Sequence, residues 1–138
     1  MKKAFVIIPL LLLIAGCSKK FEKLEVFSPE AFAYTLDSGW ELNASARVKG
    51  FVQNESGGKF SASIKYYADI ETPDGGLIEK AASGEINKSS AERMTDLAIE
   101  AQIKLEAGSV KGIYKITFFI TDKGDGREAK ASNFFELN

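Results

Sequence analysis

Histidine is absent from the 138-residue sequence, and cysteine occurs once, tryptophan once and methionine twice. Without an imidazole base, Ser-His-Asp and Cys-His nucleophilic catalysis are excluded. The same absence removes histidine-ligated zinc, copper and non-haem iron sites. One cysteine cannot form an internal disulfide, so a hydrophobic core must hold the fold. These absences argue against an enzyme and against a resident metal or cofactor.

Phosphate-binding features are missing as well. The sequence has neither the GxxxxGK[ST] nor the GxGxxG pattern that cradles phosphates. Lysine and arginine number 18 against 19 aspartates and glutamates, which leaves no basic excess for a nucleic acid. A glycoside hydrolase needs only a pair of carboxylates, but a chain this small offers little depth for such a site. We therefore expect a non-enzymatic protein without a nucleic-acid partner.

The N-terminus carries a short apolar run, residues 4–15, directly after Lys2 and Lys3. As a helix this run would rise about 18 Å, which is less than the ~30 Å hydrocarbon core of a bilayer. A basic start, a short apolar run and small residues before a cleavage point are typical of a secretory signal. We expect residues 1–16 to be a signal peptide.

The stretch Ile14–Cys17 (IAGC) resembles the lipobox of bacterial lipoproteins. The resemblance implies cleavage between Gly16 and Cys17, and a Cys17 that carries a diacylglyceryl group and fatty acids such as palmitate. Ser18 follows, in place of the aspartate that retains many such proteins in the inner membrane, which implies the outer membrane. Two alternatives stay open, namely a plain signal peptide with an incidental cysteine and an uncleaved anchor.

Residues 17–22 then form the lipidated cysteine and a short charged tether of about 20 Å, and residues 23–138 are long enough for one core. Apolar and polar residues alternate in several segments of this region, which predicts half-buried β-strands. Turn-forming residues separate them. The clearest strands are expected at 40–52, 59–71, 113–121 and 127–137, with weaker ones at 22–27, 31–36 and 77–87.

Residues 89–106 are ambiguous, because Ser89 and Glu92 match a helix capping box while the following apolar residues alternate with period two. A helix would leave Ile99 and Ile103 off its apolar stripe, so we favour a strand over 96–105, preceded by one helical turn. Seven or eight short strands predict an antiparallel β-sandwich or a small barrel.

The segment AGSVKGIYKITFFITDKGDGREAKASNFFEL resembles the last two strands of immunoglobulin-like domains of the bacterial envelope, although barrels share this pattern. Gly112, Tyr114, Asp122 and Gly124 occupy the matching positions. The resemblance implies an immunoglobulin-like sandwich in which the Tyr114 hydroxyl bonds to backbone in the loop before its strand. It implies a fold and no activity.

Three aromatic doublets, 66–67, 118–119 and 134–135, place one ring of each on either side of a strand. We expect Tyr67, Phe119 and Phe134 to face outward, and Phe51 by the same count. Such rings could form a partner-binding surface. They could equally be scattered rings covered by lysine stems.

The register of the last hairpin bears on this choice, because core residues must pair with core residues. Ile120 should then pair with Ala129 across a loop at 122–127. Phe119 would lie opposite Lys130, and Phe134 opposite Lys115, which separates the two rings along the sheet.

Trp40, next to Gly39, could stack on a sugar or belong to the core. Asp122, Asp125 and Glu128 could offer oxygen ligands to calcium. Their DKGDG context is first of all that of a hairpin turn, so we expect no metal site.

We expect a lipid-anchored accessory module that binds a protein of the cell envelope, attached to the outer membrane and facing the periplasm. Two alternatives remain open. One is a carbohydrate- or small-ligand-binding module that uses Trp40 and the outward tyrosines. The other is a surface-exposed adhesin or protease-inhibitory domain.

Overall fold

The computed structural model describes residues 22–138, and the expected signal peptide and Cys17 lie outside this range. Eight strands form within it, and every strand pair is antiparallel. Residues 22–138 contain no helix, and hence none long and apolar enough to cross a bilayer. The strands are β1 (Glu25–Thr35), β2 (Trp40–Lys49), β3 (Asn54–Ser56), β4 (Lys59–Glu71), β5 (Leu77–Ser90), β6 (Leu97–Leu105), β7 (Gly112–Asp122) and β8 (Glu128–Leu137).

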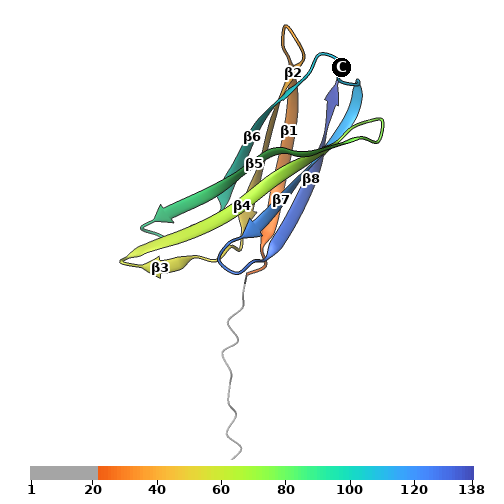
Figure 1. Cartoon of the computed structure of the whole chain (residues 1–138). Helices are drawn as coiled ribbons and strands as arrows, with labels where there is room; N and C mark the ends of the chain where they lie inside the picture. Colours follow the sequence, from red (N-terminus) through yellow and green to blue (C-terminus); the bar gives the residue numbers. More distant parts are fainter. Residues whose placement is uncertain (1–21) are drawn as a thin grey trace, which may run out of the picture.

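The strands form two sheets that pack face to face as a β-sandwich (Figure 1). One sheet has the order β1-β2-β6, and we call it the three-stranded sheet. The other has the order β5-β4-β7-β8, with the short β3 paired to the first residues of β4, and we call it the large sheet. The expectation of an all-β fold with antiparallel sheets is therefore confirmed.

Period-two alternation explains why these segments are strands. Along β2 and β6 every second residue is buried, which places one face of each strand in the core and the other toward solvent. Burying a leucine or isoleucine side chain contributes roughly 1.5–3 kcal/mol. The largest apolar side chains that are fully buried are Tyr114, Phe118, Leu42, Ile64, Ile70, Leu97, Ile99, Ile116, Ile120, Leu137 and Val48.

The register of the β7–β8 hairpin is the one that the sequence predicts. Ile120 pairs with Ala129, Phe119 with Lys130 and Lys115 with Phe134. The turn is closed by the backbone N–H of Gly126, which donates to the Asp122 carbonyl at 2.7 Å. Matching of apolar positions across the hairpin was therefore sufficient to fix this register.

Residues 97–105 are a strand, as favoured from the sequence, and pair with β2 from Trp40–Leu105 to Val48–Leu97. The alternation keeps Ile99 and Ile103 in the core, which a helix would not. The helical turn expected before this strand is absent, because residues 91–96 are irregular.

The first strand differs from expectation. The two weak strands expected at 22–27 and 31–36 are one strand, β1, with a bulge between Phe27 and Glu30. Ser28 has a φ of 49° and precedes Pro29, which has no N–H to donate to the ladder. The bulge shifts the register, so the two halves of β1 remain paired with β2 even though their alternation is interrupted.

Candidate functional site

Tyr67 and Phe119 lie side by side on the outer face of the large sheet. They are register partners on β4 and β7, and their rings stack with centroids 4.8 Å apart and an interplanar angle of 12°. Both side chains are half-buried. A stacked pair of this kind contributes about 0.5–1.5 kcal/mol beyond the area it buries. The structure thus brings two of the predicted surface aromatics into contact.

A bulge in the β4–β5 pair places a cation above this stack. The register shifts between Ala68 and Ile70, and opposite this shift Lys80 has a φ of 47°. The Lys80 backbone N–H donates to the Asp69 carboxylate at 2.8 Å, and its Nζ lies 5.5 Å from the centre of the Tyr67 ring. Bulges commonly redirect a side chain in this way. The contact adds about 0.5–1 kcal/mol of cation–π attraction at an exposed site.

Phe134 lies on the same face but away from the stack. It is 61% exposed and pairs with Lys115, four residues before Phe119 on β7, or about 13 Å along the strand. The hydroxyls of Thr117 and Ser132 occupy the row between, 2.8 Å apart. The three outward aromatics are therefore a stacked pair and a separate ring.

Shallow depressions follow this face. One of about 370 Å³ is lined by the stacked pair and by Thr121, Glu128 and Lys130. A second of about 350 Å³ continues toward Lys115 and shares Phe119 and Lys130 with the first. We call the two together the aromatic trough. Its walls combine aromatic rings, hydroxyls and charges of both signs, which suits recognition of an extended surface.

Phe51 does not lie on the surface, contrary to expectation, and Trp40 takes the core position that was one of the two roles considered for it. Phe51 is only 6% exposed. Strand β2 ends at Lys49, and the chain then turns at Gly50, which has a φ of 76°, so the alternation does not continue to Phe51. Trp40 is 7% exposed and belongs to the core cluster. Neither ring can receive a partner or stack on a sugar.

Tyr114 lies at the start of β7, fully buried and stacked on Phe135 with ring centroids 5.1 Å apart. Its hydroxyl donates to the Val110 carbonyl, four residues earlier in the β6–β7 loop. Burial raises the pKa of the Tyr114 phenol above its ordinary value. The contact fastens the loop to the sandwich.

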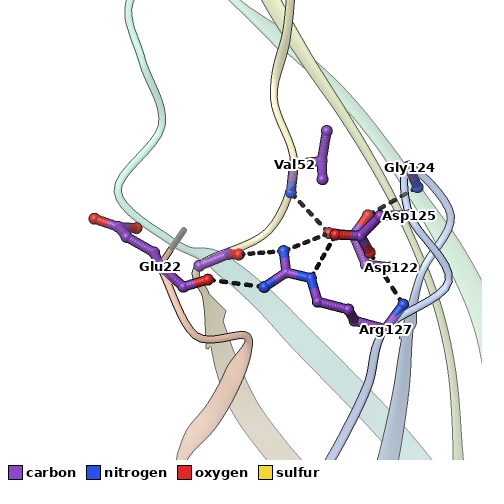
Figure 2. Close-up of polar contacts among 7 residues, drawn as sticks. Glu22, Val52, Asp122, Gly124, Asp125 and Arg127 are labelled. Carbon is purple, nitrogen blue, oxygen red and sulfur yellow. Dashed lines mark hydrogen bonds and ion pairs between the residues drawn. The ribbon is translucent and has the colours of Figure 1, made fainter. Parts of the chain in front are cut away.

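The carboxylates of Asp122 and Asp125, in the hairpin at 122–128, bond to groups of the protein itself (Figure 2). Asp122 is completely buried and accepts the backbone N–H groups of Val52 at 2.7 Å and Gly124 at 2.9 Å. The Arg127 guanidinium lies 3.5 Å from the same carboxylate. The backbone N–H of Arg127, followed by its guanidinium, holds the pKa of Asp125 below its usual value. Among residues 22–138 no group of three or more acidic or cysteine side chains is arranged to hold a metal.

Arg127 also links distant parts of the chain. Its two terminal nitrogens donate to the Glu22 and Gly50 carbonyls, each at 2.8 Å (Figure 2). We call Arg127 with Asp122, Gly50 and Glu22 the arginine clamp. The clamp fixes the start of the described chain against the β7–β8 hairpin.

Sequence reasoning missed two exposed aromatics on the other sheet. Phe32 and Tyr34 on β1 are 59% and 54% exposed and face solvent. Their i, i+2 spacing was a usable signal, since such residues share one face of a strand. The bulge at 27–30 obscured which face of this strand was the apolar one.

No family model matches the chain, and no curated protein matches it. Among solved structures, the chain is similar to a family 123 glycoside hydrolase from Clostridium perfringens, analysed for glycolipid glycan hydrolysis. The likeness covers 86% of this chain with a TM-score of 0.55 and 12% sequence identity. The chain spans 27% of the length of that protein. At this identity the similarity concerns the fold alone.

Proposed function

We propose that this protein is a lipid-anchored, non-enzymatic module of the bacterial cell envelope that binds another protein through the aromatic trough. The observation that carries the binding proposal is the stacked Tyr67–Phe119 pair, with Lys80 above it and the two depressions of the aromatic trough beside it. Tyrosine and phenylalanine are enriched at the centres of protein interfaces. Two rings already held against each other lose little conformational entropy when a partner covers them.

The finer fold assignment in this proposal is immunoglobulin-like. Three supporting observations are the two sheet orders, β1-β2-β6 and β5-β4-β7-β8, and the bond from Tyr114 to Val110. Immunoglobulin-like sandwiches divide their strands in a related way and carry a tyrosine that bonds upstream at the same corner. Such a scaffold presents a sheet face or loops to a partner and implies no particular chemistry.

The anchor rests on the lipobox pattern at Ile14–Cys17. The arginine clamp fits an attachment at this point, because it binds the Glu22 carbonyl, five residues after the proposed lipid site. The sandwich is then held close to the membrane, with the β7–β8 hairpin nearest to it. The outer membrane, facing the periplasm, is the location that we propose.

Two experiments separate the parts of this proposal. For the anchor, intact-mass spectrometry of the purified protein should show loss of residues 1–16 and addition of acyl chains. Cys17→Ser should move the protein from the membrane to the soluble fraction. A membrane-bound protein of unprocessed mass would exclude the lipoprotein assignment.

For the trough, in-cell crosslinking followed by purification of the lipidated form should capture a defined envelope protein. The double variant Tyr67→Ser/Phe119→Ser should lose this capture while keeping the wild-type circular dichroism spectrum. Phe134→Ser is the matched control on the same sheet, because Phe134 lies about four residues away from the stack. Equal capture by the wild-type protein and the double variant would refute the trough as the partner site.

The surface-exposed alternative, an adhesin or inhibitory domain, makes a different prediction. Protease treatment of intact cells would remove a surface-exposed sandwich and leave a periplasmic one intact. The version of the sugar-binding alternative that used Trp40 is not retained, because that ring is in the core.

A further inference from the structure

The outer face of the three-stranded sheet carries a separate depression, on the opposite side of the sandwich from the aromatic trough. It has a volume of about 520 Å³, and Phe32 of β1 forms one wall. Its floor is the β2–β6 ladder, where Asn43 pairs with Gln102 and Ser45 with Glu100. A further depression of about 260 Å³ shares Ser45 and Glu100 and extends it toward Arg47. We call the two together the amide groove.

One polar atom in the amide groove has no partner. Asn43 Oδ1 is shielded from solvent and accepts no hydrogen bond within residues 22–138, the only such side-chain atom there. A shielded, unpaired acceptor is unfavourable, so its retention calls for an explanation. Phe32 and Gln102, the neighbours of Asn43 on the adjacent strands, are both exposed. A ligand in the groove would therefore lie beside Asn43 and could supply the missing donor.

The chemistry of the lining indicates the kind of ligand. The side chains around Phe32 are amides, a hydroxyl and a carboxylate, which together offer many acceptor oxygens. A suitable ligand therefore presents several donors around an apolar face that can lie on an aromatic ring. A sugar ring has this form, with hydroxyls at its rim and C–H groups on its face. A protein side chain would find no apolar pocket here, because Phe32 is the only apolar side chain that lines the depression from the outer face, and Ala44 and Ala101 point into the core.

The charges along the groove further restrict the kind of ligand that it can bind. Glu100 lines both parts of the groove and Glu30 lines the smaller one. Arg47, the only cation that lines it, is already paired with Asp96. An anionic polymer would thus meet carboxylates without a free cation. From Asn43 to Arg47 the groove follows four residues of β2, about 13 Å, which is longer than one sugar ring.

We propose that the amide groove is a binding site for a neutral glycan chain, with Phe32 as the stacking ring and Asn43 Oδ1 as the acceptor for a sugar hydroxyl. The site is independent of the aromatic trough and of the protein partner proposed above.

The test uses the full chain in a zwitterionic detergent without a sugar headgroup, because a glycosidic detergent would compete. The probes are cellohexaose, maltohexaose and N-acetylchitohexaose, with hexagalacturonate as the anionic comparison. At least one neutral hexasaccharide should bind saturably by calorimetry and shift the backbone amide resonances of residues 43–45 and 100–102. Hexagalacturonate should bind at least about tenfold more weakly. The absence of binding by every neutral probe, or equal binding of the anionic one, overturns the proposal.

Two variants assign the roles. Phe32→Ala should weaken binding about tenfold, the effect of losing one aromatic contact. It should fold normally, because Phe32 is 59% exposed. Asn43→Val should also lose at least about tenfold in affinity, while its melting temperature rises because the unpaired acceptor is gone. A purely structural Asn43 would leave affinity unchanged. Tyr67→Ser/Phe119→Ser should bind the glycan like the wild-type protein, and a loss of affinity in this variant would relocate the site.

Discussion

Removal of the Asp122 carboxylate should destabilise the protein more than any other single change in an acidic side chain. Asp122 is fully buried and accepts two backbone N–H groups, those of Val52 and Gly124. In Asp122→Ala the Val52 N–H loses its partner in a part-buried site, at a cost of about 1–3 kcal/mol. The Gly124 N–H is more exposed and can bond to water, and Arg127 loses a buried counter-ion but keeps its two carbonyl acceptors. The sum is about 2–4 kcal/mol, or a fall in melting temperature of about 8–16 °C for a chain of this size.

Urea unfolding followed by fluorescence provides the assay. Trp40 is the single tryptophan and is buried, so its emission reports global unfolding. The midpoint should fall while the slope with denaturant is unchanged. Asp125→Ala is the matched control, because Asp125 binds the same arginine from an exposed turn, and it should cost less than about 1 kcal/mol. An Asp122→Ala variant within about 1 kcal/mol of wild type, or no worse than Asp125→Ala, would refute this account of the clamp.

Three further predictions concern the core and the turns. Tyr114→Phe should cost about 1 kcal/mol at neutral pH. Burial raises the pKa of the Tyr114 phenol above the value near 10 that it has in the unfolded chain. Ionisation of the phenol therefore favours the unfolded state, and the wild-type protein should lose stability as the pH rises above about 10. The variant has no phenol at this position, so it should lose less stability over the same pH range in urea titrations. Gly50→Ala should destabilise by more than about 1 kcal/mol because Gly50 has a φ of 76° and an added Cβ would lie 2.0 Å from the Lys23 carbonyl oxygen; a melting temperature equal to wild type would contradict this. Phe51→Ala should cost about 3–5 kcal/mol of folding stability, whereas Phe134→Ala should be almost neutral in the same denaturation assay. A larger loss of stability in Phe134→Ala than in Phe51→Ala would contradict the core position of Phe51.

Alternation and apolar matching were enough to predict most strands. Residues 59–71 were identified to the residue as β4, because polar and apolar side chains alternate there without interruption. The last hairpin was predicted down to its register, because Ile120 must pair with an inward-facing residue. In both segments the local sequence pattern and the packing of the core favour the same structure.

The errors occur where the backbone leaves the regular strand. Counting residues past Gly50 assigned Phe51 to the wrong face, since the positive φ of Gly50 breaks the alternation. The bulge near Ser28 hid the outward positions of Phe32 and Tyr34 in the same way. A single sequence contains no signal for Arg127 reaching Glu22, 105 residues earlier, because this contact depends on how the ends of the two sheets meet.

The arginine clamp has a mechanical consequence. A force applied through the N-terminal segment enters the sandwich at Glu22 and continues into β1, which runs away from that end beside β2 (Figure 1). If a partner holds the protein on the large sheet, tension then acts along β1 and loads its ladder with β2 in shear, so that many hydrogen bonds share the force. Without Arg127 the same pull would first peel away the segment before Glu25. If the protein is attached through its N-terminal segment, as proposed, the clamp decides whether the sandwich resists tension as a unit or begins to unfold from that end.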